Sequence, residues 1–224
     1  MQVAIDGPAS AGKSTVAKII AQKLDFIYID TGAMYRACTV IARSHHLDYG
    51  DEAGILKAID QDGIELKAVN GEQKVFAGTK DISREIRTPE ISANVSQVSA
   101  LAGVRAKMVI LQRQMAGKVN VIMDGRDIGT TVLPAAEVKI FLVASPRSRA
   151  QRRMLDLQER GIKSDKTVDE IEQDIADRDY KDSHREISPL KKASDAIEID
   201  TTTMTIDQVV AAILAEIKKS QKKL

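Results

Sequence analysis

The stretch Gly7-Pro-Ala-Ser-Ala-Gly-Lys-Ser14 decides the fold, because it fits the phosphate-binding pattern G-x-x-x-x-G-K-[ST]. The residues before it, Gln2-Val-Ala-Ile-Asp6, predict a short buried strand. In residues 15–24, apolar side chains recur at helical spacing. A strand, a glycine-rich loop and a helix in this order are the context in which the pattern binds a polyphosphate. A chance glycine-rich turn is the alternative, and it does not explain why both flanks agree.

Each part of this loop has a physical role in binding a nucleotide. The helix N-terminus supplies unpaired N–H groups and partial positive charge, and glycines let the backbone approach the phosphates. We predict that Lys13 reaches the β- and γ-phosphates and that the Ser14 hydroxyl binds Mg²⁺. The predicted ATP-binding residues are Gly7, Pro8, Ala9, Ser10, Ala11, Gly12, Lys13, Ser14 and Thr15.

The composition limits the class of protein. At 224 residues and 43% hydrophobic content, the chain suits one large domain with insertions. Its net charge of +1 does not indicate a general polyanion binder, so an anionic substrate has to meet locally concentrated Arg and Lys. The histidines lack metal-ligand spacing, since His45 and His46 are adjacent and His184 is distant.

The cysteine count and the hydropathy pattern indicate where in the cell the protein is expected. Cys38 is the only cysteine, so no intramolecular disulfide forms, and we expect it to be a small apolar packing residue. We find neither a signal peptide nor an apolar run of about 18 residues. We therefore expect a cytoplasmic protein without membrane contact. We also expect a monomer that does not contact nucleic acid.

Short apolar runs separated by helical stretches predict an α/β fold with a parallel sheet covered on both faces. Ligands bind at the carboxyl ends of the strands in such sheets. Three polar residues fall at those ends, namely Asp30, Asp124 and Ser145. The five predicted strands are residues 2–6, 26–29, 119–123, 138–143 and 196–199.

Two stretches break this alternation. Residues 33–118 are too long for a simple crossover, and they contain a predicted hairpin at 64–69 and 73–76 with Asn70-Gly71 as its turn. A third strand is predicted at 78–81, with helices near 34–44, 51–60 and 83–116. Residues 147–190 are charged and helical, and capping boxes at Thr167 and Thr205 each predict a helix start. The predicted organisation is a core of 1–32, 119–146 and 191–224, an insertion at 33–118 and a lid at 147–190.

Charged residues at the strand ends are candidates for phosphoryl-transfer chemistry. Asp124 is placed like a Walker B acid that holds Mg²⁺, although an acid at a strand end can also cap a helix. Arg126 lies next to Asp127 between glycines, where the alternative is a surface ion pair. Thr31 and Arg36 follow the second strand, beside the loop.

Basic residues are also spaced to share helix faces within 147–190. Arg149, Arg152 and Arg153 have i, i+3, i+4 spacing, and a second set follows the spacing i, i+4, i+7. This second set is Arg178, Asp182 and Arg185, which share a face if the helix continues. Like charges stacked in this way repel unless an anion lies between them, and the alternative is a solvated basic face.

Taken together, these motifs resemble the bacterial cytidylate kinases of the nucleoside monophosphate kinase family over nearly the whole chain. The inserted hairpin is a further feature of that family. The segment Tyr180-Lys-Asp-Ser-His184 departs from the more Arg- and Asp-rich family pattern. The motifs that carry the resemblance are Gly7–Ser14, Asp30–Arg36, Glu85–Thr88, Ser96–Ser99 with Val104-Arg105, Asp124–Thr130, Arg152–Gln158 and Arg178-Asp179.

The resemblance implies a fold and a set of roles. The fold is a five-stranded parallel sheet of the P-loop nucleoside monophosphate kinase type, with an NMP-binding insertion that carries a small antiparallel sheet and with a helical lid. The implied CMP-binding residues are Arg36, Arg126 and Arg185 for the 5′-phosphate, Ser96, Arg105 and Asp127 for cytosine, Arg178 and Asp182 for ribose and phosphate, and Thr31 at a hydroxyl position. The implied catalytic residues are Lys13, Arg126, Arg149, Arg153 and Arg178, with Ser14 and Asp124 at the metal.

The predicted activity is Mg²⁺-dependent transfer of a phosphoryl group from ATP to CMP or dCMP. A kinase for another acceptor, such as UMP, AMP or a small metabolite, is the alternative within enzymes. A GTP-binding switch is disfavoured because the guanine-reading pattern Asn-Lys-x-Asp is absent from the chain. The near-neutral net charge disfavours a nucleic-acid-binding module.

Overall fold

The computed structural model describes residues 1–69, 72–117, 119–159, 161–162 and 164–222. Its backbone contacts divide the chain into two compact units. The first unit comprises Met1–Ile27 and Lys118–Leu224, and the second comprises Tyr28–Gly117. The chain therefore leaves the first unit within its second strand and returns after the insertion.

A five-stranded sheet with the order β2-β6-β1-β7-β8 forms the core, as the apolar runs predict. β1 pairs in parallel with β6 and β7, and β7 pairs in parallel with β8. The strands start within two residues of the predicted positions. They are β1 (Gln2–Asp6), β2 (Ile27–Asp30), β6 (Val121–Gly125), β7 (Val138–Val143) and β8 (Ile197–Asp200).

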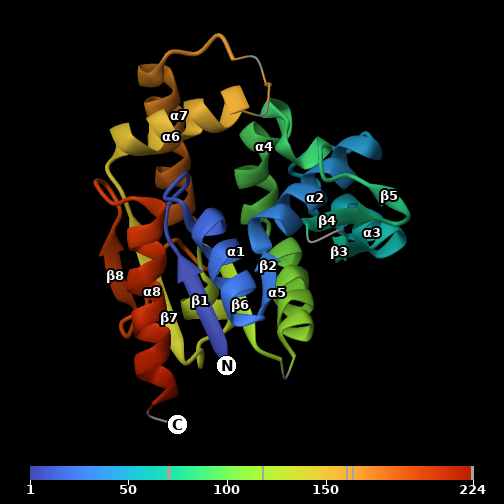
Figure 1. Ribbon diagram of the computed structural model, residues 1–224. Coiled ribbons are helices and arrows are strands. Elements are labelled where there is room, and N and C mark those ends of the chain that lie inside the picture. The colour runs from blue at the N-terminus through green and yellow to red at the C-terminus, as the bar shows by residue number, and fades with distance from the viewer. Residues whose placement is uncertain (70–71, 118, 160, 163, 223–224) are drawn as a thin grey trace. The chain divides into compact units, whose positions relative to one another are not determined.

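Two helices pack against the central strands of this sheet. α1 (Lys13–Leu24) contacts β1 and β6, and α8 (Ile206–Gln221) contacts β7 and α1 (Figure 1). The capping box that opens α8 at Thr205 is present as predicted. The buried face of α8 is an apolar stripe, formed by Val209, Val210, Ile213 and Ile217.

A pair of helices follows β7 in the first unit. α6 (Pro146–Glu159) packs against α7 (Val168–His184) through Ala150, Ile171 and Ile175. The predicted capping box at Thr167 opens α7. α7 ends at His184, and Arg185 is its C-cap with extended backbone. The assumption that one helix carries Arg178, Asp182 and Arg185 is therefore wrong for Arg185.

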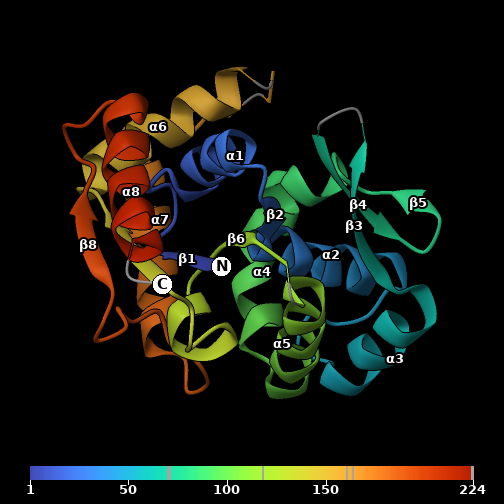
Figure 2. The same ribbon diagram turned by 60° about the horizontal axis from the view of Figure 1, so that its bottom comes forward.

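The second unit combines helices with a small antiparallel sheet (Figure 2). The predicted hairpin is confirmed as β3 (Ile64–Val69) and β4 (Glu72–Ala77), and the third strand as β5 (Lys80–Asp81). The predicted turn at Asn70-Gly71 lies outside the described residues. α2 (Thr31–Ser44) and α3 (Glu52–Asp62) occupy the predicted helical stretches.

The helical stretch expected at 83–116 is not continuous. It divides into the short helix η1 (Glu85–Arg87), α4 (Pro89–Ala100) and α5 (Ala102–Ala116). Thr88 has the extended backbone that a residue before proline favours, and its hydroxyl caps α4. Leu101 is also extended and separates α4 from α5.

Cys38 behaves as a packing residue, as expected. Its side chain is fully buried, and its Sγ lies 3.6 Å from Met108 Sδ. Burial raises the pKa of the Cys38 thiol to about 12, so the reactive thiolate is suppressed. In the described part of the chain, no helix is both long enough and apolar enough to span a membrane.

Candidate active site

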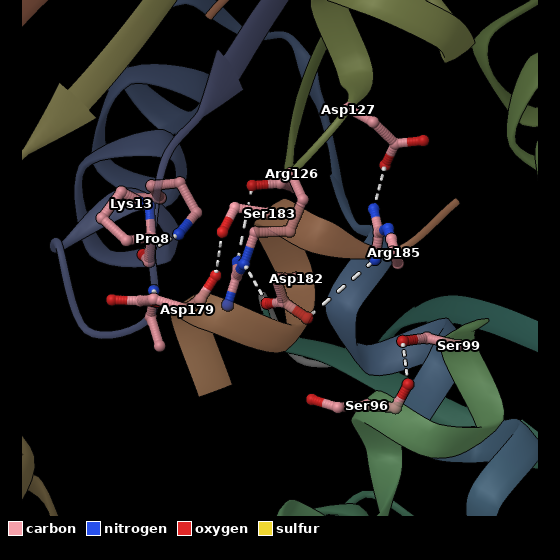
Figure 3. Close-up of polar contacts among 12 residues, drawn as sticks. Pro8, Lys13, Ser96, Ser99, Arg126, Asp127, Asp179, Asp182, Ser183 and Arg185 are labelled. Atoms are coloured by element: carbon pink, nitrogen blue, oxygen red, sulfur yellow. Dashed lines mark hydrogen bonds and ion pairs between the residues drawn. The ribbon is translucent and has the colours of Figure 1, made fainter. Parts of the chain in front are cut away.

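The phosphate-binding loop joins β1 to α1 in a conformation that needs glycine. Gly7 has φ of 146°, and a Cβ at this position would lie 2.1 Å from the Leu142 carbonyl oxygen. Gly12 has φ of 92° and is the N-cap of α1. The buried Lys13 side chain turns back over the loop, and its Nζ donates to the Pro8 carbonyl oxygen at 2.7 Å (Figure 3). The ammonium group therefore lies at the loop that would hold the phosphates.

Ser14 and Asp124 lie together, as the predicted metal site requires. Ser14 Oγ donates to Asp124 Oδ2 at 2.8 Å, because Ile5 in β1 pairs with Asp124 in β6. Asp124 lies inside β6, and the cap position of the following helix belongs to Asp127, so Asp124 is not a helix cap. Among the described residues, no three His, Cys, Asp or Glu side chains form a metal cluster. One hydroxyl and one carboxylate suit an ion that takes its other ligands from water and phosphates, as Mg²⁺ does.

Three arginines of the first unit surround two buried carboxylates. Arg126 Nε donates to Asp182 Oδ2 at 3.0 Å, and Arg185 Nη2 lies 3.6 Å from Asp127 Oδ1 (Figure 3). Burial alone would raise the pKa of Asp182, but Arg126, Arg178 and Arg185 together hold it below its usual range. Asp182 thus remains charged and holds Arg126 in place.

Three cations, Lys13, Arg126 and Arg178, lie close together next to the loop. Burial, followed by the charge of Arg126, lowers the pKa of Arg178 to about 10. Its Nε is buried and finds no hydrogen-bond acceptor among the residues that the structure describes. Burial and Arg126 likewise lower the pKa of Lys13 to about 7. These depressed pKa values mean that an anion bound here would relieve repulsion among the three cations.

The arginines of α6 share a helix but contact different partners. Arg149 is buried, donates to the Ala9 carbonyl oxygen at 3.1 Å and pairs with Asp179. Arg152 donates to the hydroxyl and the carbonyl oxygen of Thr201. Arg153 pairs with Asp156 at 3.1 Å and adds to the positive potential at Arg178. The structure thus places Arg149 at the phosphate-binding loop and Arg152 at the segment after β8.

In the second unit, Asp30 organises the end of β2. Its Oδ1 accepts from the Ala33 backbone N–H at 2.8 Å, which caps α2. Its Oδ2 lies 3.4 Å from Arg36 Nη2 and 3.0 Å from Arg87 Nη2. These two arginines outweigh burial and lower the pKa of Asp30. Thr31 is buried at the start of the same helix.

The predicted cytosine-reading residues of this unit are linked through Ser99. The Arg105 side chain is 2% exposed, lies over the Tyr35 ring at 5.1 Å and donates to the Ser99 carbonyl oxygen at 3.0 Å. Ser99 Oγ donates to the Ser96 carbonyl oxygen at 3.2 Å, inside α4 (Figure 3). Arg105 and Ser96 therefore belong to one local network, in which Arg105 is firmly held.

Three charged residues at the sites were not assigned roles from the sequence. Asp6 accepts two backbone hydrogen bonds from the loop after β6, Asp179 contacts Ala9 and Arg149, and Arg87 pairs with Asp30. Asp6 directly precedes Gly7, so adjacency to the phosphate-binding loop was its signal, and Asp179 belongs to the quoted motif Arg178-Asp179, which assigned a role to Arg178 alone. Arg87 belongs to the quoted motif Glu85–Thr88, but that motif carried no assigned contact.

The chain is similar to known proteins over nearly its whole length. A family model described as cytidylate kinase matches residues 3–219. A cytidylate kinase from Lactobacillus gasseri is 70% identical over 222 residues, which is 99% of this chain and 96% of the relative. Cytidylate kinases from Streptococcus sanguinis and Lactiplantibacillus plantarum are 51% and 52% identical, over 97% and 96% of their lengths and 98% and 99% of this chain.

The fold is also found at low sequence identity. A solved structure of an uncharacterized protein from Eubacterium ventriosum aligns with a TM-score of 0.50 at 10% identity, over 97% of this chain and 98% of that chain. At this identity, the similarity concerns the fold alone.

Proposed function

The chain belongs to the cytidylate kinase family and is a nucleoside monophosphate kinase, and on this premise we propose that it transfers the γ-phosphoryl group of Mg²⁺·ATP directly to CMP or dCMP, forming ADP and CDP or dCDP. One observation carries the proposal. Lys13 of the phosphate-binding loop, Arg126 after β6 and Arg178 in α7 lie close together: besides burial, the charge of Arg126 lowers the pKa of both Lys13 and Arg178, and Arg178 also lowers that of Lys13. Such crowding of cations next to a P loop supports the binding of two polyanions at one place.

The reaction needs little proton chemistry from the protein. The nucleophile would be an oxygen of the CMP phosphate, which is already anionic, so no general base is needed. The chain has to cancel charge and align the two phosphates in line. Lys13 and Arg178 would hold the transferring phosphoryl group, while Arg126 would hold the acceptor phosphate. Arg149 and Arg153 of α6 would add positive charge near the donor.

Ser14 and Asp124 would hold the metal ion. Their oxygens lie 2.8 Å apart and form an all-oxygen donor set, which suits Mg²⁺. When bound, Mg²⁺ would neutralise charge on the β- and γ-phosphates. Ser14 and Asp124 themselves would fix its place relative to the loop.

We propose that the acceptor is recognised by residues that ion pairs or hydrogen bonds hold in place. Asp127 would accept from the cytosine amino group, with Ser96 assisting, and Arg105 would donate to cytosine N3. Arg105 is suited to this because Tyr35 and Ser99 fix its guanidinium. The remaining proposed contacts to ribose and phosphate are those of Thr31, Arg36, Arg126, Arg178, Asp182 and Arg185.

Water is a competing acceptor, so transfer requires its exclusion. The insertion at 33–118 and the lid at 147–190 are the segments that would close on the two nucleotides.

A coupled assay of ADP release tests the proposal with CMP, dCMP, UMP and AMP as acceptors. We expect CMP and dCMP to be phosphorylated far faster than UMP and AMP, with no turnover when Mg²⁺ is removed by chelation. Preferred turnover of UMP or AMP would overturn the acceptor assignment. The Lys13→Ala variant supplies the background rate of contaminating kinases.

A further inference from the structure

The carboxylate of Asp6 forms a two-pronged contact with the loop after β6. Oδ1 accepts from the Ile128 backbone N–H at 2.8 Å, and Oδ2 accepts from the Gly129 N–H at 2.7 Å. Asp6 is the last residue of β1 and directly precedes Gly7. The side chain is 5% exposed, so water does not compete for these hydrogen bonds. One buried carboxylate therefore ties the start of the phosphate-binding loop to the start of η2 (Ile128–Val132).

The segment held in this way carries two residues of the acceptor site. Between the end of β6 at Gly125 and the start of η2 lie only Arg126 and Asp127. Asp6 pairs in register with Gly125, so the contact closes a very short loop from both ends. From this loop, Arg126 reaches Asp182 and Asp127 reaches Arg185. A shift of the backbone at Ile128 would therefore move both side chains.

Stability does not explain the presence of a carboxylate at this position. The pKa of Asp6 is raised to about 6, because burial and the nearby charge of Asp127 raise it by more than the two backbone N–H groups and Lys13 lower it. The aliphatic part of Lys139 also lies here, because its Cδ and Asp6 Oδ2 both approach Gly129, while its ammonium group pairs with Asp195. A charged group that is costly to bury, yet satisfied by two backbone donors, suits a positional role.

We propose that Asp6 is a positioning residue, which acts through the N–H groups of Ile128 and Gly129 to hold Arg126 and Asp127 in register with the phosphate-binding loop. The proposal rests on the function proposed above, since Arg126 and Asp127 are its acceptor contacts. Asp6 then aligns the acceptor with the donor phosphates without touching either nucleotide. Its loss should weaken CMP binding and slow transfer while ATP binding remains intact.

Asp6→Asn is the direct test, because asparagine keeps the size of the side chain but can accept only one of the two hydrogen bonds. Its amide NH₂ would face the second backbone N–H. We expect kcat/KM for CMP to fall about 10- to 100-fold, the range of one hydrogen bond to a charged group. KM for CMP should rise, and the Kd of ATP, measured by titration calorimetry without acceptor, should change less than about threefold.

Ile5→Val is the matched control. Ile5 neighbours Asp6 on β1 and is fully buried, so this variant lowers the melting temperature without touching the contact. A loss of folded protein lowers the apparent kcat in either variant but leaves KM unchanged. The proposal predicts a raised KM for CMP in Asp6→Asn alone. An unchanged KM for CMP in Asp6→Asn, or a Kd of ATP weakened as strongly as CMP binding, overturns it.

Gly129→Ala perturbs the same contact at the backbone donor and not at the carboxylate. This variant tests the proposal if Asp6→Asn does not fold. A Cβ at Gly129 would lie 3.4 Å from Asp6 Oδ2 and 3.2 Å from Lys139 Cδ. We expect the same rise in KM for CMP, at a smaller size, and an unchanged Kd of ATP. An unchanged KM for CMP here also overturns the proposal. Failure of the proposed function is separate, since wild-type protein would then phosphorylate neither CMP nor dCMP.

Discussion

The backbone N–H of Ala9 donates to Asp179 Oδ1 at 3.2 Å, so a carboxylate of α7 occupies a donor that the phosphate-binding loop would offer to ATP. Arg149 contacts both partners, through the Ala9 carbonyl oxygen and the other oxygen of Asp179. In this arrangement, a phosphate must displace Asp179 before it can bind the Ala9 N–H. Asp179 would thus compete with the donor nucleotide for the loop.

Replacing Asp179 should therefore tighten donor binding. We expect Asp179→Ala to lower the Kd of ATP about 2- to 10-fold, the free-energy range of one hydrogen bond, as measured by titration calorimetry. Asp177→Ala is the control, because this carboxylate lies exposed on the same helix and accepts from Gln173. Weaker ATP binding in Asp179→Ala would show that Asp179 instead holds Arg149 in its productive position.

Lys13→Ala should abolish turnover and leave the fold intact. The ammonium group lies at the phosphate-binding loop and is proposed to meet the transferring phosphates, and groups of this kind are worth about 100-fold or more in kcat. The loss should not lower the melting temperature, because burial disfavours the charged form and depresses the pKa of Lys13 to about 7. Lys23→Ala, at the other end of α1, is the control. Retention of more than about a tenth of wild-type kcat would contradict the assigned role.

Asp127 should determine the choice between cytosine and uracil. Cytosine presents an amino donor where uracil presents an oxygen, so a carboxylate favours CMP. Asp127→Ala should therefore reduce kcat/KM for CMP strongly and for UMP only slightly, with about 1–3 kcal/mol lost for CMP. Steady-state assays with both nucleotides measure the ratio. Because Asp127 lies 3.6 Å from Arg185 Nη2, an equal loss for both substrates would mean that it acts through Arg185 instead.

α6 and α7, the helices of the proposed lid, should become protected when both nucleotides bind. α6 and α7 carry the arginines proposed to meet the phosphates, and transfer requires that water be excluded. ATP and CMP are added together without a metal ion, so that no transfer occurs during the measurement. Amide hydrogen exchange should then be slower in residues 147–190 than in the protein without nucleotides. Equal exchange in the presence and absence of nucleotides would count against closure.

Asp6 should make the folding stability depend on pH. Its pKa is raised from 3.8 to about 6 in the folded protein, so the unfolded chain releases this proton at lower pH. The ionised form is therefore disfavoured by folding, and its cost develops as pH rises from about 4 to about 6, reaching about 3 kcal/mol above pH 6. Asp6→Asn lacks this titration. The stability of wild type relative to Asp6→Asn should fall over this pH range in urea unfolding, and a constant difference would refute the raised pKa.

Local sequence was sufficient for the elements whose signals are short-range. The alternation of apolar strands with helices, the glycines of the P loop and the capping boxes at Thr167 and Thr205 all act within a few residues, and the structure contains each of them. The prediction of one helical stretch at 83–116 was wrong, because the apolar content of these residues gave no sign of the two places where the helix is interrupted. Thr88 before a proline was a readable signal, whereas the extended backbone at Leu101 follows no local rule.

The sequence by itself determined which residue types reach the nucleotide end of the sheet, because a P loop and parallel strands fix where their ends lie. Tertiary structure decided which charges meet there. Arg149, Arg152 and Arg153 look equivalent in sequence, yet packing directs Arg149 to Ala9 and Arg152 to Thr201, whereas Arg153 pairs with Asp156 within the same helix. Partners separated by long stretches of chain, such as Asp6 with Ile128 and Asp179 with Ala9, become neighbours only when the strands and helices pack, since no short-range pattern encodes their distance.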